Sequence, residues 1–92
     1  MTVDEVKREL TENILATIAK GRAEVNGAEV NGAAVSWVKS EAREAGFTGL
    51  GNMSRFESIC EDLGFSVIPG ITLSGTAKGG GVKRNKARVV FL

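Results

Sequence analysis

This 92-residue sequence has no histidine and no tyrosine, and it has only one cysteine, one proline and one tryptophan. Histidine is the commonest general base and the commonest metal ligand, so its absence argues against most catalytic and zinc sites. The single cysteine, Cys60, cannot form an internal disulfide, and its apolar neighbours in a helical pattern predict a small core residue. We therefore expect no enzyme activity, no metal site and no cofactor.

Long apolar segments are missing as well. No run approaches the roughly 20 apolar residues that a transmembrane helix needs, and the acidic first five residues do not resemble a signal peptide. The apolar fraction of 42% and the charged fraction of 25% are those of an ordinary folded domain. The sequence predicts one cytoplasmic domain over residues 1–92 and no membrane partner.

Acidic residues are absent from the last 28 positions. Residues 65–92 carry five Lys and Arg, whereas residues 1–64 carry seven Lys and Arg against eleven acids, a net charge of −4. The overall charge of +1 therefore conceals an acidic body and a basic segment of +5. Such a basic segment is typical of a surface that contacts a polyanion. Its five cations are Lys78, Lys83, Arg84, Lys86 and Arg88.

Apolar spacing and capping residues predict three helices. Thr2 with Glu5 fits a capping box at the start of the first helix, whose apolar residues recur at three- and four-residue steps. Asn31 is a suitable cap for the second helix and Asn52 for the third. The expected helices cover residues of about 3–20, 32–45 and 53–63.

Strands are predicted in two places. Asn26-Gly27 is a strong turn signal before a short strand near residues 28–30, although a plain connecting loop is the alternative. At the C-terminal end, two apolar runs indicate a hairpin over about 65–92. Pro69-Gly70 is expected to break or bulge its first strand. The expected parts of this hairpin are a strand at 65–73, a glycine-rich basic loop at 74–85 and a strand at 87–92.

The order of these elements resembles the winged helix-turn-helix superfamily over nearly the whole chain. Residues 35–64, with glycines between two helices, are similar to the helix-turn-helix, and residues 65–92 are similar to the hairpin wing. The Gly-Phe-Ser-Val stretch after the third helix is also similar to the LOTUS-type winged helices that bind RNA. The resemblance implies an α+β fold, a winged helix of three helices, a short strand and a C-terminal β-hairpin wing. It also implies that the third helix is presented to nucleic acid.

We expect a small non-enzymatic nucleic-acid-binding protein, with DNA favoured over RNA. Transcription regulation in a phage or mobile element is a setting that fits such a protein, and tight specific binding would call for a homodimer or a protein partner. The basic wing and the start of the third helix would contact phosphates. The alternative for each group is a solvated surface without function. The candidate residues are Asn52, Ser54, Arg55, Ser58, Lys78, Lys83, Arg84, Asn85, Lys86 and Arg88.

A second hypothesis is a protein-interaction module, such as a small regulator or inhibitor. Trp37 lies off the main apolar stripe of its helix, where it either covers the edge of the core or anchors a partner. Acidic residues on the helices would dock a basic partner, because fold alone does not fix function. The residues for this alternative are Trp37, Glu41, Glu44, Glu57, Glu61 and Asp62.

Overall fold

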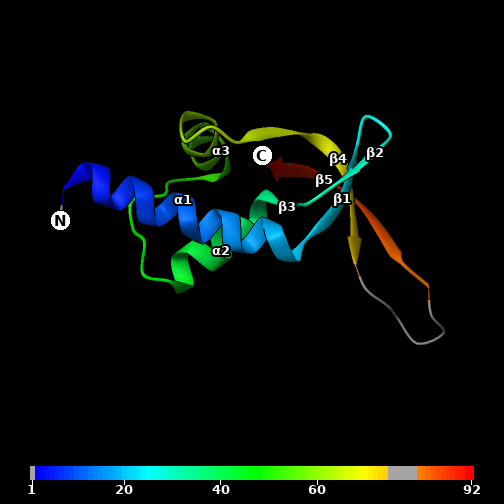
Figure 1. Ribbon diagram of the computed structural model, residues 1–92, viewed down its shortest axis with the longest axis horizontal. Helices are drawn as coiled ribbons and strands as arrows, with labels where there is room; N and C mark the ends of the chain where they lie inside the picture. Colours follow the sequence, from blue (N-terminus) through cyan, green and yellow to red (C-terminus); the bar gives the residue numbers. More distant parts are fainter. Residues whose placement is uncertain (1, 75–80) are drawn as a thin grey trace.

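The structure is a computed structural model that describes residues 2–74 and 81–92. In this part of the chain, three helices and five strands form an α+β fold (Figure 1). The helices gather at one end, two antiparallel hairpins extend toward the other, and the principal extents are 47 × 25 × 20 Å. The elements are α1 (Val3–Lys20), β1 (Arg22–Val25), β2 (Ala28–Val30), β3 (Gly32–Ala34), α2 (Val35–Glu44), α3 (Met53–Asp62), β4 (Ser66–Ser74) and β5 (Lys83–Phe91).

Side-chain caps begin α1 and α3, as the sequence predicted. The Thr2 hydroxyl accepts a hydrogen bond from the Glu5 amide at 3.1 Å. The Asn52 side-chain oxygen accepts one from the Arg55 amide at 2.9 Å. Each bond satisfies an amide that has no partner within its helix. Neither α1 nor any other helix among residues 2–74 and 81–92 combines the length and apolar character required to cross a membrane.

The predicted start of the second helix was wrong. Residues 32–34 form β3, α2 begins at Val35, and its N-cap is Ala34 rather than Asn31. Gly32 and Ala33 pair with residues of β5 near the end of the chain. This long-range pairing overrides the local preference of the sequence for a helix, a common outcome for short segments.

The five strands form one antiparallel sheet in the order β2-β1-β4-β5-β3. The strand at residues 28–30 and the turn at Asn26-Gly27 are confirmed, and both turn residues have positive φ. β1 was not predicted; it pairs with β2 on one side and with the outer half of β4 on the other. Through β1, the first hairpin is joined to the C-terminal hairpin.

Pro69-Gly70 does not interrupt β4, contrary to expectation. Pro69 lies opposite Arg88 and Gly70 opposite Ala87 in an unbroken register. Among the residues described, β1 pairs with β4 only at Ile71 to Leu73, so β4 has β5 as its single strand neighbour at Pro69. A proline is tolerated there because no second strand needs its missing amide proton. Gly70 permits a close approach, since a Cβ at this position would lie 2.7 Å from the Glu24 carbonyl oxygen.

The core has two parts. The larger part lies between the helices and the inner half of the sheet and includes Ile14, Val38, Phe56 and Cys60, all fully buried. The prediction that Cys60 is a core residue is therefore confirmed. The smaller part, around Ala23, Val25 and Val89, joins the two hairpins. As far as the structure describes the chain, the residues of this cluster all come from strands.

Candidate nucleic-acid interface

The predicted basic loop is mostly strand where the structure describes it. Lys83, Arg84 and Asn85 belong to β5 and pair with Ser74, Leu73 and Thr72 of β4. The final strand thus begins at residue 83 instead of 87, and pairing with β4 is the reason. Lys78 lies outside the described residues.

The alternation of side chains sorts the basic residues of β5 onto two faces of the β4–β5 hairpin. Arg84, Lys86 and Arg88 share one face, while Lys83 and Asn85 lie on the other. All five are exposed. The five steps from Lys83 to Arg88 span about 17 Å at the usual rise of a strand. We call the four cations of β5 the basic row: Arg84, Lys86 and Arg88 lie on one face of the hairpin and Lys83 on the other.

Arg84 is engaged by an acidic residue of β1. Its two terminal nitrogens donate to the carboxylate oxygens of Glu24 at 2.6 and 2.9 Å, across the intervening strand β4. These hydrogen bonds lower the pKa of Glu24 and raise the pKa of Arg84. The pair is bidentate, so it orients the guanidinium as well as balancing its charge.

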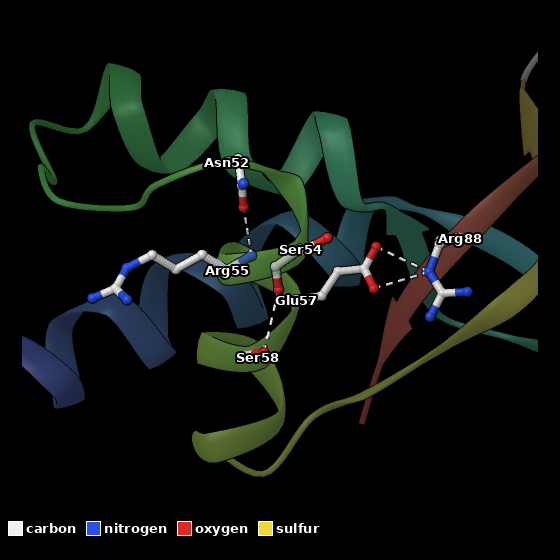
Figure 2. A network of polar contacts seen from close by, with 6 residues as sticks. All are labelled: Asn52, Ser54, Arg55, Glu57, Ser58 and Arg88. Carbon is white, nitrogen blue, oxygen red and sulfur yellow. Dashed lines mark hydrogen bonds and ion pairs between the residues drawn. The ribbon is translucent and has the colours of Figure 1, made fainter.

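Arg88 is engaged by an acidic residue of α3, as Figure 2 shows. The Arg88 Nε donates to both carboxylate oxygens of Glu57 at 2.9 Å. Glu57 is one of the acids assigned to the alternative docking face, and here it neutralises a candidate phosphate contact. By contrast, Lys83 and Lys86 form no ion pair within residues 2–74 and 81–92.

The candidate residues at the start of α3 are separated from the outer hairpin and do not all share one surface. Asn52 uses its side-chain oxygen to cap α3, and the Ser58 hydroxyl donates to the Ser54 carbonyl oxygen at 3.2 Å. Arg55 extends away from Arg88, on the opposite side of α3 from the Glu57 carboxylate (Figure 2). The structure thus joins Glu57 to Arg88 and leaves Arg55 on another surface.

The residues of the alternative docking face also have identifiable surroundings. Trp37 is 38% exposed, and its indole Nε1 donates to Glu41 at 3.1 Å. Glu44 and Glu61 are exposed on α2 and α3, as is Asp62 at the end of α3. Two of the acids assigned to this face, Glu41 and Glu57, therefore have partners within the chain.

Sequence reasoning missed a cleft of about 300 Å³ beside Trp37. The end of α1, the start of β1 and the outer end of β4 meet there, so that Lys20, Arg22 and Ser74 line the same space as the indole. The two cations on either side of Gly21 were the available sequence signal. Their proximity to Trp37 depends on tertiary structure. Comparisons of this chain with protein-family models, curated proteins and solved structures found no match.

Proposed function

We propose that this protein is a small, non-enzymatic nucleic-acid-binding protein of winged-helix type, with DNA favoured over RNA. The observation that carries the proposal is the basic row on β5, exposed on a hairpin that extends from the helical end of the molecule (Figure 1). The element order α1, β2, α2, α3, β4, β5 also retains the order on which the resemblance rests, with β1 and β3 added. In this proposal the β4–β5 hairpin acts as the wing.

Phosphate neutralisation is the mechanism that the hairpin supports best. Lys83 and Lys86 supply charge without a carboxylate partner among the residues described, so they contribute most to the electrostatic attraction. Arg88 uses only Nε in its bond to Glu57 and retains its two terminal NH₂ groups as donors. Arg88 would therefore contribute hydrogen bonds to a phosphate rather than additional net positive charge. Ser54 precedes Glu57, the partner of Arg88, by three residues on α3 and would add a hydroxyl.

The test measures fluorescence anisotropy of labelled double-stranded DNA, single-stranded DNA and RNA over a salt series. The informative variant is Lys83→Gln/Lys86→Gln, because removing these two cations disrupts none of the ion pairs described. The control is Lys7→Gln/Arg8→Gln, which makes the same charge change at exposed positions of α1. Binding should weaken strongly and lose most of its salt dependence in the hairpin variant only.

Two results would contradict the proposal. The first is equal binding by the hairpin variant and the α1 control, which would remove the hairpin from the interface. The second is the absence of binding to all three nucleic acids at low salt by a folded protein. The second result would favour the protein-interaction hypothesis instead.

A further inference from the structure

The cleft beside Trp37 has the composition of a site for a flat anionic ligand. Its floor is formed by backbone and small residues, because Gly21 and Gly32 touch where α1 gives way to the sheet. The Gly32 amide donates to the Gly21 carbonyl oxygen at 3.3 Å, and a Cβ on Gly21 would lie 2.1 Å from the Gly32 oxygen. Its volume of about 300 Å³ is at the lower end of the range for small-ligand pockets.

The Trp37 indole forms the aromatic side of this cleft. Its Nε1 is already bonded to Glu41, which fixes the orientation of the ring and satisfies its only donor. The exposed part of the indole is therefore available for stacking rather than for a further hydrogen bond. Stacking on an aromatic side chain is how proteins bind unpaired bases of any sequence.

Two cations, Lys20 and Arg22, belong to the lining of the cleft. Lys20 has no ion pair in the described residues. Ser74, also in the lining, is opposite Lys83 in the antiparallel register, and residues paired in this way point to the same face. Arg22 is balanced by Glu29 at 2.7 Å and contributes donors more than charge.

We propose that this cleft binds one unpaired nucleobase of a single-stranded nucleic acid, with the base stacked on Trp37 and the adjoining phosphates at Lys20 and Lys83. The inference rests on the proposed function and names the form of nucleic acid that the same surface accepts. A base within a duplex is already stacked and paired, and it would have to leave the helix to reach a cleft of this size. Ser74 supplies a hydroxyl for the edge of the base, since a hydroxyl both donates and accepts.

Trp37 and Lys83 belong to separate hypotheses in the sequence. Trp37 is the expected anchor of a protein-docking face, whereas Lys83 is part of the expected nucleic-acid-binding wing. The outer end of β4 connects them, because Ser74 lines the space beside Trp37 and pairs with Lys83 at the start of β5. A single strand lying along β5 would therefore enter the cleft at its outer end.

The first experiment uses Trp37 itself as the reporter, since it is the only tryptophan in the chain. The protein is titrated with an oligothymidine, with an oligomer of the same length made of abasic sites, and with a duplex. Stacking predicts a strong change in tryptophan fluorescence with oligothymidine and little change with the abasic strand or the duplex. An unchanged tryptophan signal on binding of oligothymidine, with binding verified by anisotropy, would overturn the inference.

The second experiment compares Trp37→Ala with Trp37→Phe, both checked for folding by circular dichroism. We expect Trp37→Ala to weaken oligothymidine binding about tenfold, within the range produced by loss of one stacked base. Duplex binding should be unchanged, and Trp37→Phe should restore most of the affinity. Equal oligothymidine binding by Trp37→Ala and the wild type would refute the inference while leaving the proposed function intact, provided that Lys83→Gln/Lys86→Gln still weakens binding. Failure of every nucleic acid to bind would refute both and leave Trp37 to a protein partner.

Discussion

If the β4–β5 hairpin binds nucleic acid as proposed, its two ion pairs make that affinity adjustable through acidic residues. Glu24 holds Arg84 and Glu57 holds Arg88, so two of the four described cations of β5 are balanced. The variant Glu24→Gln/Glu57→Gln removes both negative charges and keeps side chains of similar size. Each pair joins an exposed arginine to a partly buried glutamate at the surface. Because surface ion pairs contribute about 1 kcal/mol or less each, the fold should be retained.

The salt dependence of binding gives the expected magnitude. Each cation that neutralises a phosphate contributes about −0.9 to the slope of log K against log salt. Lys83 and Lys86, which have no carboxylate partner among the described residues, therefore give about −1.8, and all four cations about −3.6. If both proteins bind equally at about 1 M salt, this difference makes the variant about 60-fold tighter at about 0.1 M. Lys78 lies outside the described residues and adds equally to both proteins, so the difference is unaffected by it.

The assay is fluorescence anisotropy with one labelled DNA between about 50 and 200 mM salt. The control is Glu9→Gln/Glu12→Gln, which makes the same charge change at exposed positions of α1. A steeper slope in the hairpin variant and not in the control would support the reasoning. If the two variants gain affinity equally, net charge and not the released arginines is responsible. An unchanged slope in the hairpin variant would refute the reasoning outright.

Two further predictions concern stability, measured by urea unfolding. Burial, with smaller effects of Glu57 and Glu61, raises the pKa of the Cys60 thiol to about 12, whereas an unfolded chain has about 8.5. The thiol's contribution to stability is thus complete below pH 8.5 and is lost as pH rises toward 12. At pH 10 the free energy of unfolding should be lower by about 2 kcal/mol from this cause. This loss should disappear in Cys60→Ala. An identical pH dependence of stability in the wild type and Cys60→Ala would contradict the prediction. Gly70→Ala should lower the free energy of unfolding by about 1–3 kcal/mol, because the added Cβ would crowd the β1 backbone and Val89. The control Gly81→Ala, where a Cβ would have nothing within 4 Å, should lower it far less. Equal losses in the two variants would show that crowding is not the cause.

The parts of the fold that were predictable are those that depend on neighbours in sequence. The caps at Thr2 and Asn52 lie three residues from their partners, and the Asn26-Gly27 turn contains its own conformational requirement. The short strands β1 and β3 were missed because their identity depends on partners far along the chain. For β3 those partners are Val89 to Phe91, which the local preference of residues 32–34 cannot reveal.

The candidate site was predictable as a list of charges and not as an arrangement. The basic residues of β5 are evident from the sequence, whereas their pairing with Glu24 and Glu57 is not. Arg84 is separated from Glu24 by 60 residues, and Arg88 from Glu57 by 31. Counting charges by segment therefore overstated the free positive charge of the hairpin by two.

The sequence by itself determined the helical periodicity, the caps, the buried cysteine and the charge contrast between body and tail, because these follow from residue type and short-range spacing. Tertiary structure alone decided which cations remain without a carboxylate partner and which side chains surround Trp37. Ion pairing and cleft formation depend on distances of a few ångströms between segments that are remote in sequence. Those distances are set when β1, β4 and β5 align in one sheet.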